Sequence, residues 1–287
     1  MKEVKTPRFS VIVPVRNRKK MLSRCIKTIL DQTISDLELI IVDNGSTDDT
    51  REYIKDLLKK DPRIRYLEES ERGIGRARNR GEIASKGEIV LMTDSDCEVP
   101  RNWIERMSAP IIEGSVPAVQ GLKHAIKRNY WSTNVEREEH RIMWSLFERH
   151  GSSNVDTANF CIQRKVLKKV GYSNRKMNNL NDTELAARLF QKGYGVALLD
   201  LSVGHHNPLS PWVAARKLVQ RGAYHTMVRK RYPDNPALPR ETIRMFLGYL
   251  LGLVSEMLHI DRSFPYDLVS GISWRFGLVC GTLMRPR

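Results

Sequence analysis

The chain has 287 residues, of which 41% are hydrophobic, so it can form one large domain with a buried core or a domain with an appendage. Lys and Arg (48) outnumber Asp and Glu (33), and the formal net charge of +15 indicates an anionic partner: nucleic acid, anionic lipid or a phosphorylated substrate. The four cysteines are far apart in the sequence, which argues against a zinc site or a disulfide framework and favours a reducing, cytoplasmic setting.

Apolar runs alternate with amphipathic segments through the first third of the chain. Residues 1–8 are charged and contain no hydrophobic signal-peptide segment. Strands are predicted at residues 9–15, 37–42, 64–67 and 88–92, and the segments between them have apolar residues at helical spacing. This alternation indicates an α/β fold with a parallel sheet covered by helices on both faces.

Polar residues follow these strands where they end. Arg16-Asn17 follows the first strand, Asp43-Asn44 the second, and Thr93-Asp94-Ser95-Asp96 the run at residues 88–92. Open α/β sheets bind ligands at the carboxyl ends of their strands, so these side chains are expected near one another. Carboxylates two residues apart suit Mg²⁺ or Mn²⁺, which prefer oxygen ligands, although Asp and Ser are also common in turns.

Gly73-Ile74-Gly75 is expected to open a helix that carries Arg76, Arg78 and Arg80. The glycines match neither the Rossmann pattern nor a Walker A loop. A helix N-terminus can bind phosphate, and Arg76 or Arg80 can pair with it. For either of these two arginines taken singly, a solvated helix face is the simpler interpretation.

The second half of the chain is less regular. Strands are predicted at residues 116–122, 157–162 and 196–203, and helices at residues 135–150, 164–170 and from Asn181 onward. Ile142 and Met143 are expected on the apolar side of the first of these helices, and Leu185, Leu189 and Phe190 are spaced for burial in the last. Asp182 lies near the start of that last helix, as a cap or as a carboxylate directed at a pocket. His205 and His206 follow the last strand, where a histidine is a plausible third metal ligand, although adjacent histidines in a loop are often only exposed polar residues.

The composition changes again near the C-terminus. Residues 211–232 predict a basic helix, and residues 245–260 and 268–284 are mostly apolar but at the lower limit of the length that spans a bilayer. We interpret them as amphipathic helices that lie on a membrane or pack on the domain, with a helical hairpin in the bilayer as the alternative. The predicted division is a domain at residues 1–240 and a helical, partly apolar appendage at residues 241–287.

Several of these segments resemble motifs of the family 2 glycosyltransferases, which have the GT-A fold. They occur in the family's order and together cover roughly residues 8–210. The matching segments are Val11-Ile12-Val13-Pro14-Val15-Arg16-Asn17, Val42-Asp43-Asn44-Gly45-Ser46-Thr47-Asp48, Gly73-Ile74-Gly75-Arg76-Ala77-Arg78-Asn79, Asp94-Ser95-Asp96 and Asn181-Asp182-Thr183-Glu184-Leu185.

The resemblance implies a nucleotide-sugar donor and a divalent cation, Mn²⁺ or Mg²⁺. By similarity, Asp43 would face the base of the donor, Asp94 its ribose or sugar, and Asp96 the metal, with His205 or His206 completing the metal site. Asp182 matches the family's catalytic base. The residues that the resemblance assigns to the donor are Pro14, Val15, Arg16, Asn17, Asp43, Gly73, Arg76, Arg80, Asp94 and Ser95.

The chain departs from the family pattern in places. The family usually has Glu-Asp where this chain has Asn181-Asp182, and the Gly-Gly-Phe-Asp-Glu-like segment at the acceptor site appears as Gly171-Tyr172-Ser173-Asn174. The Gln-x-x-Arg-Trp motif of processive synthases is missing, so we expect transfer of one sugar, with inversion at the anomeric carbon. The basic and apolar C-terminal region favours a lipid-linked or cell-surface glycan as acceptor and a peripheral position on the cytoplasmic face of an anionic membrane.

Other classes of protein fit part of the sequence. A basic nucleic-acid-binding protein would explain the net charge of +15, but the sequence contains no zinc finger, RNA-recognition aromatics or evident helix-turn-helix, and we expect no nucleic-acid partner. A nucleotidyltransferase also places acidic metal ligands on an α/β sheet. A catalytically inactive scaffold is disfavoured because Asp94, Asp96 and Asp182 are all present.

Overall fold

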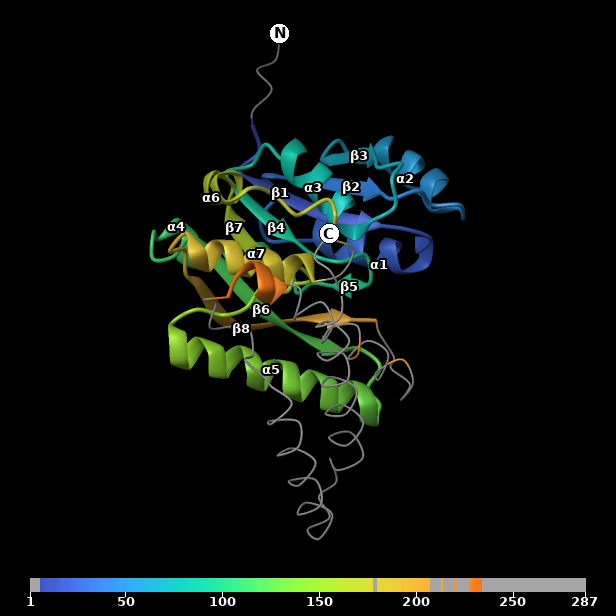
Figure 1. The fold of residues 1–287 in the computed structure, drawn as a ribbon. Coiled ribbons are helices and arrows are strands. Elements are labelled where there is room, and N and C mark those ends of the chain that lie inside the picture. The colour runs from blue at the N-terminus through green and yellow to red at the C-terminus, as the bar shows by residue number, and fades with distance from the viewer. Residues whose placement is uncertain (1–5, 178–179, 207–212, 214–218, 220–227, 234–287) are drawn as a thin grey trace. The chain divides into compact units, whose positions relative to one another are not determined.

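The computed structural model describes residues 6–177, 180–206, 213, 219 and 228–233 (Figure 1). The strands are β1 (Phe9–Val15), β2 (Leu37–Asp43), β3 (Ile64–Glu68), β4 (Ile89–Met92), β5 (Cys97–Glu98), β6 (Ala118–Ala125), β7 (Phe160–Gln163) and β8 (Val196–His205). The helices are α1 (Lys19–Leu30), α2 (Thr50–Leu58), α3 (Ile74–Ala84), α4 (Trp103–Ile112), α5 (Tyr130–His150), α6 (Arg164–Val170) and α7 (Asn181–Gln191).

The strands form one 8-stranded sheet in the order β3-β2-β1-β4-β7-β6-β8-β5. The strands β3, β2, β1 and β4 are parallel, which confirms the parallel sheet predicted for the first third of the chain. The sheet as a whole is mixed, because β7 runs antiparallel to both β4 and β6, and β5 runs antiparallel to β8.

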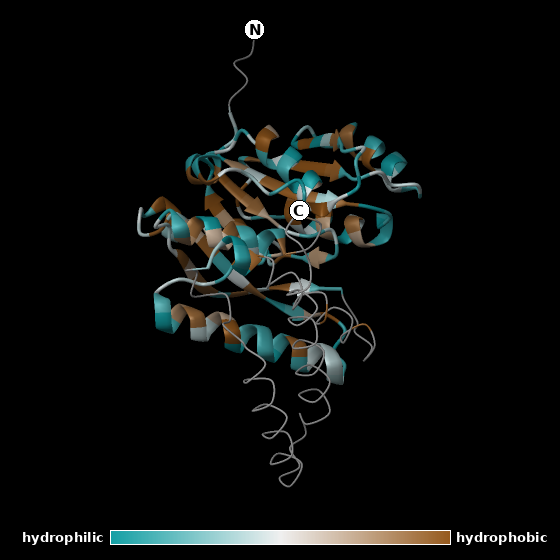
Figure 2. Cartoon of the chain, viewed as in Figure 1, coloured by the Kyte–Doolittle hydropathy of each residue, from teal (hydrophilic) through white to brown (hydrophobic). Residues whose placement is uncertain are grey.

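Helices cover both faces of the parallel part of the sheet (Figure 1). Val11 and Val13 of β1 belong to a core cluster with α1 and α4, whereas Ile12 belongs to a second cluster with α3, α6 and α7. Successive strand side chains point to opposite faces, so every position of β1 and β2 is buried. This burial explains the unbroken apolar runs, which Figure 2 shows as brown strands inside the fold.

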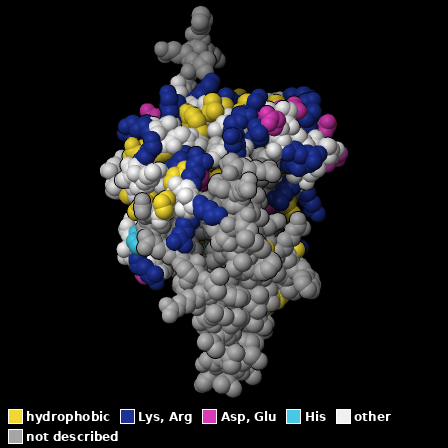
Figure 3. Space-filling model, in the orientation of Figure 1, with side chains coloured by type: hydrophobic (Ala, Val, Ile, Leu, Met, Phe, Trp, Pro, Cys, Tyr) yellow, Lys and Arg dark blue, Asp and Glu magenta, His cyan; other side chains and the backbone are white. Residues whose placement is uncertain are grey.

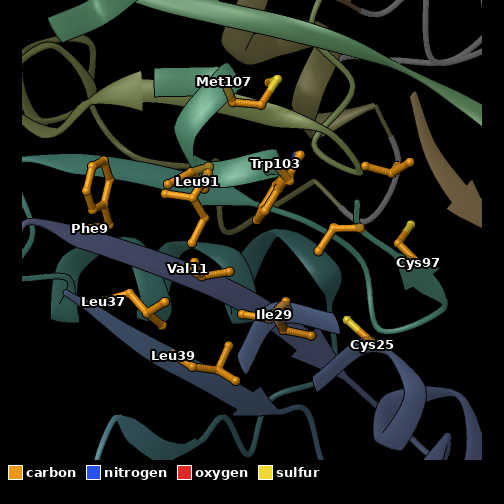
Figure 4. Packing of buried hydrophobic residues seen from close by; sticks show 14 of the residues in the cluster. Phe9, Val11, Cys25, Ile29, Leu37, Leu39, Leu91, Cys97, Trp103 and Met107 are labelled. Atoms are coloured by element: carbon orange, nitrogen blue, oxygen red, sulfur yellow. The ribbon is translucent and has the colours of Figure 1, made fainter. Parts of the chain in front are cut away.

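Large side chains fill the first of these clusters. Trp103 of α4 and Ile29 of α1 are fully buried, and they lie beside Leu91 and Val11 of the sheet (Figure 4). Burying one such side chain stabilises a fold by about 1.5–3 kcal/mol. The cluster thereby fixes the ends of the strands that carry the candidate site.

Not every residue expected in the core is buried. Phe190 was expected to be buried with Leu185 and Leu189, but 42% of it is exposed. Successive helix residues are about 100° apart, so Phe190 lies off the face that Leu185 and Leu189 share. Ile142 of α5 is exposed in the same way at 43%, while its neighbour Met143 is buried.

We expect replacement of Gly75 by Ala to destabilise the fold by about 1–3 kcal/mol, the usual cost of overpacking. A Cβ at Gly75 would lie 2.3 Å from the carbonyl oxygen of Asn174 and 2.4 Å from that of Met177, so the backbone would have to shift. Urea unfolding of Gly75→Ala, compared with Gly195→Ala, measures this cost. At Gly195 the nearest atom is 3.9 Å away, so that variant is the matched control. Equal stability of the two variants would contradict the close approach.

The chain divides into two compact units, Met1–Ile126 with Met143–His206, and Lys127–Ile142 with Asn207–Arg287. The sheet and all the site residues discussed below belong to the first unit. Within the residues that the structure describes, no helix has the length and apolar character needed to cross a bilayer. Most of the basic helix predicted at residues 211–232, and the whole appendage predicted at residues 241–287, lie outside the described residues.

Candidate active site

The polar segments after β1, β2 and β4 lie at one edge of the sheet. Val15 pairs with Asp43 in the strand register, and the amide of Asn44 donates to the carbonyl oxygen of Val15 at 2.9 Å. The amide of Thr93, after β4, donates to the carbonyl oxygen of Ile12 at 3.3 Å. The sheet therefore brings these segments together as the sequence predicts. Pro14 and Val15 are buried in β1, and Arg16 is exposed.

Asn17 joins the loop after β1 to the loop after β2. Its amide donates to Oγ of Ser46 at 3.0 Å, and its Oδ1 accepts the amide of Thr47 at 2.7 Å. Its φ of 52° lies in the left-handed region, which Asn adopts more readily than most residues. The two loops therefore form one wall of the site.

Asp43 is fully buried at the end of β2. Its Oδ1 accepts the amide of Ser46 at 2.9 Å, its Oδ2 accepts the hydroxyl of Tyr66 at 3.3 Å, and Nε of Arg51 lies 3.5 Å from Oδ2. Burial and the charges of Asp43 and Glu68 raise the pKa of Tyr66 to about 12, so the phenol stays a hydrogen-bond donor. These contacts hold the Asp43 carboxylate in a fixed orientation.

Asn44 holds the loop that leads into α3. Its Nδ2 donates to the carbonyl oxygens of Glu69 (3.1 Å) and Glu71 (2.8 Å), and its Oδ1 accepts the amide of Gly73 at 2.8 Å. Gly73 has a φ of 150°, which favours glycine at this position. Sequence reasoning assigned Gly73 to the donor site and placed Asn44 at the same edge of the sheet, but it did not predict the contact between them.

The arginines of α3 differ in their surroundings. Arg80 is exposed, and Nη1 of Arg76 pairs with Glu71 at 2.7 Å. Arg78 is buried, with Nη2 donating to Oδ1 of Asp94 at 2.9 Å. No role was predicted for Arg78, because its carboxylate partner, Asp94, directly follows β4 and only the fold brings the two side chains together.

Asp96 is buried beside His205. Nε2 of His205 is 3.5 Å from Oδ1 of Asp96, too far for a good hydrogen bond. Among the residues that the structure describes, this buried oxygen has no hydrogen-bond partner. Nη1 of Arg18 contacts the other oxygen, Oδ2. Burial by itself would raise the pKa of Asp96, but His205 and Arg18 outweigh it and lower that pKa to about 2, so the carboxylate is ionised at neutral pH.

The two histidines have different partners. Nε2 of His206 lies 2.5 Å from Oε1 of Glu98, away from Asp96, although the His206 amide donates to the carbonyl oxygen of Asp96 at 2.8 Å. Ligand atoms of Asp96, Cys97 and His205 lie within 4.8 Å of one another. Burial and the nearby carboxylates raise the pKa of Cys97, so its thiol stays protonated and is a poor ligand for a hard cation.

Asp182 lies in the first turn of α7 and is half-buried. Its Oδ1 accepts the amide of Thr183 at 2.8 Å. Leu180, the residue that opens this helix, has a φ of 51°. A left-handed non-glycine residue is strained, and such residues are frequent at functional sites. In the described part of the chain, only Asn17 and Leu180 among non-glycine residues have positive φ, and both border the candidate site.

Sequence reasoning assigned no role to Arg18 or Arg78, and it placed Asn44 at the edge of the site without a role of its own. Each acts on a residue or loop that was selected: Arg18 on Asp96, Asn44 on Gly73, and Arg78 on Asp94. Asn44 and Arg78 lie inside the matched segments, and Arg18 lies directly after one. The available signal was therefore position within or beside the motifs, and only the fold identifies the partner of each side chain.

The matches to known proteins agree with this architecture. The family model described as glycosyl transferase family 2 matches residues 10–171. Glycosyltransferase GlyG of Streptococcus pneumoniae serotype 4 is 38% identical over 114 residues, which are 39% of this chain and 38% of GlyG. The GalNAc(5)-diNAcBac-PP-undecaprenol beta-1,3-glucosyltransferase of Campylobacter jejuni is 39% identical over 110 residues, 38% of this chain and 36% of that enzyme. The matches thus span less than half of these relatives.

A solved structure resembles nearly the whole chain. The mannosyltransferase PcManGT from Pyrobaculum calidifontis, in complex with GDP-Man and Mn²⁺, has a TM-score of 0.68 and 19% identity, covering 97% of this chain and 88% of that one. This likeness confirms the predicted GT-A fold. The family model matches more than half of the sequence, from β1 to the end of α6. The chain therefore belongs to glycosyl transferase family 2.

Proposed function

We propose that the protein is an inverting, metal-dependent glycosyltransferase that moves one sugar from a nucleotide-diphosphate sugar to a hydroxyl acceptor. The observation that carries the proposal is the buried Oδ1 of Asp96, which faces Nε2 of His205 and has no hydrogen-bond partner within the described part of the chain. A buried ionised oxygen without a partner is costly unless a ligand satisfies it. Family membership favours this reaction over the nucleic-acid-binding and nucleotidyltransferase alternatives.

The residues fit a divalent cation. A carboxylate oxygen and an imidazole nitrogen are ligands that Mn²⁺ accepts, and the related mannosyltransferase structure contains Mn²⁺. Asp96 and His205 would hold the cation, whereas His206 would orient the loop through its contact with Glu98. When bound, a divalent cation supplies positive charge that stabilises the departing diphosphate.

The side chains of this chain have distinct roles in the proposed reaction. Asp43 and the loop around Asn17 bind the nucleoside, and Asp94 contacts the ribose or sugar. Asp182 accepts the proton of the acceptor hydroxyl while the oxygen of that hydroxyl forms a bond to the anomeric carbon. The bond from that carbon to the diphosphate breaks, and the nucleoside diphosphate leaves. A single displacement of this kind inverts the anomeric centre.

A donor screen tests the reaction class. Purified full-length protein is given UDP-, GDP- and dTDP-sugars with and without Mn²⁺, and release of nucleoside diphosphate is followed. Metal-dependent release from one donor would support the proposal and identify that donor. Without an acceptor, donor hydrolysis can be too slow to detect, so an absence of release does not by itself decide the question. Binding of nucleoside diphosphate with Mn²⁺ is therefore measured by calorimetry in parallel. If the protein shows no release of nucleoside diphosphate and no metal-dependent nucleotide binding, the proposal is overturned.

We further propose a lipid-linked or membrane-proximal glycan acceptor. The net charge is +15, and Figure 3 shows Lys and Arg side chains in several groups on the visible face of the described part. The related enzyme of Campylobacter jejuni is named for an undecaprenol-linked substrate. A basic surface and a lipid-linked acceptor both suit a peripheral position on the cytoplasmic face of the membrane.

We expect the full-length protein to sediment with vesicles that contain anionic phospholipid and to be released by about 1 M salt, because salt screens surface charge. Vesicles of zwitterionic lipid alone are the control and should bind little. The measurement is the sedimented fraction of protein. A protein that stays in solution without detergent and does not bind the anionic vesicles would contradict the membrane proposal.

A further inference from the structure

The buried face of α3 is polar, unlike that of α1 on the opposite face of the sheet, which buries Leu22, Cys25, Ile26 and Ile29. Gly75, Arg78, Asn79 and Glu82 are spaced three and four residues apart, so they share one helix face. Buried polar side chains are retained at a cost, and they need partners. The partners of this face are Asp94, which directly follows β4, Asn181 of α7, and a later segment, residues 173–177.

That later segment leads into α7. The Glu82 carboxylate accepts both the amide and the hydroxyl of Ser173 at 2.6 Å, and Nδ2 of Asn79 donates to the carbonyl oxygen of Ser173 at 2.8 Å. Gly75 allows the carbonyl oxygens of Asn174 and Met177 to approach α3 closely. The segment that precedes the proposed base therefore docks on α3.

Arg78 makes the connection at the end of this face. Its Nη1 donates to Oδ1 of Asn181 at 2.6 Å, and its Nη2 donates to Oδ1 of Asp94 at 2.9 Å. Only 8% of the Arg78 side chain is exposed. One guanidinium thus joins the strand end that carries Asp94 to the first residue of α7, next to Asp182. Burial opposes the charge of Arg78, but the Asp94, Asp182 and Asp156 carboxylates outweigh burial and raise the pKa of its guanidinium.

We propose that Arg78 is a positioning residue that sets the base helix against the donor site, so that Asp182 is in place only when the contacts from Arg78 to Asp94 and Asn181 are intact. This inference rests on the proposed function, in which Asp94 contacts the donor and Asp182 is the base. A planar guanidinium with fixed donors suits the task, because it can bond two groups in defined directions. Misplacing a reacting group by about 1 Å can reduce the rate about 10²-fold.

Asn181 provides a test that leaves Asp94 untouched. Its Oδ1 accepts from Arg78, whereas its Nδ2 is buried and has no hydrogen-bond partner among the described residues. Asn181→Asp keeps the shape and the accepting oxygen, whereas Asn181→Leu keeps the branch at Cγ and removes the acceptor. If the bond to Arg78 positions the base, the two variants must differ, even though both side chains have the same number of heavy atoms.

The experiment measures hydrogen exchange, nucleotide affinity and transfer on the full-length protein. Exchange of the backbone amides of Glu184 and Leu185 reports whether the first turn of α7 is held in place. We expect Arg78→Gln and Asn181→Leu to exchange about tenfold faster there than wild type, and Asn181→Asp to match wild type. For transfer, Asn181→Leu should lower kcat about 10²-fold while the Kd of nucleoside diphosphate with Mn²⁺ changes less than about threefold. Arg78→Gln should also weaken that Kd, because it releases Asp94.

Arg65→Gln is the matched control. Arg65 pairs with Glu38, which is likewise a buried carboxylate, but near the amino ends of the strands. The Arg65→Gln variant should unfold more easily than wild type, but its hydrogen-exchange rates in α7 and its kcat should equal those of wild type. A purely structural role for Arg78 would instead give Arg65→Gln a similar loss of kcat and of exchange protection in α7, or would give equal losses of both in Asn181→Asp and Asn181→Leu. Either result overturns the proposal.

Failure of the proposed function has a different signature. If the wild-type protein neither binds nor turns over any donor, the reaction class is wrong. The hydrogen-exchange data still decide whether Arg78 holds α7. Unchanged exchange in Arg78→Gln and Asn181→Leu would refute the positioning role even in an active glycosyltransferase.

Discussion

Replacing Asp182 by Asn is expected to reduce sugar transfer about 10²–10⁴-fold, the usual contribution of general acid–base catalysis. The amide keeps the size of the carboxylate but cannot accept the proton of the acceptor hydroxyl. Asp182 is half-buried at the start of α7, and Oδ1 already accepts the amide of Thr183. Binding of the donor should be retained, because the donor site is built from other strands.

The measurement separates chemistry from binding. Initial rates of transfer are compared with the Kd of nucleoside diphosphate in the presence of Mn²⁺. Asp200→Asn is the control, since Asp200 is an exposed carboxylate on β8 and its substitution should change neither quantity. A transfer rate equal to that of wild type in Asp182→Asn would show that another group is the base.

Replacing Asp96 by Ala is expected to lower transfer by about 10³-fold or more and to remove its dependence on Mn²⁺, because the charge that a metal contributes is worth several kcal/mol. Asp96 offers the buried oxygen without a hydrogen-bond partner, so no other carboxylate in the described residues replaces it at that point. Calorimetric titration with Mn²⁺ and nucleoside diphosphate gives the affinity directly.

Neighbouring variants make this prediction specific. His205→Ala should weaken Mn²⁺ binding, whereas His206→Ala should affect it less, because His206 faces Glu98. Cys97→Ser is the matched control within the same cluster, since a protonated thiol contributes no ligand and Ser has nearly its shape. Loss of metal dependence in Cys97→Ser with retention in Asp96→Ala would reverse the assignment.

The parallel half of the fold could be predicted because its signals are local. The strands β1 and β2 are buried on both faces, so their sequences are apolar at nearly every position, and polar loops mark their ends. The helix α6 was predicted with its observed bounds. By contrast, the burial of Phe190 was predicted wrongly. Phe190 lies near the apolar face of its helix, and the sequence does not show how far around the helix the sheet covers that face.

The sequence by itself determined the residue types of the site and their order: Asp43, Asp94, Asp96 and Asp182 lie in motifs whose spacing is local, so a linear pattern carries them. Only the tertiary structure decided which side chains meet. It paired Asp96 with His205, turned His206 to Glu98, and buried Arg78 between Asp94 and Asn181. These contacts join residues up to 109 positions apart, from Asp96 to His205. Such pairs depend on strand order and helix packing, and a hydrophobic pattern along the chain contains neither.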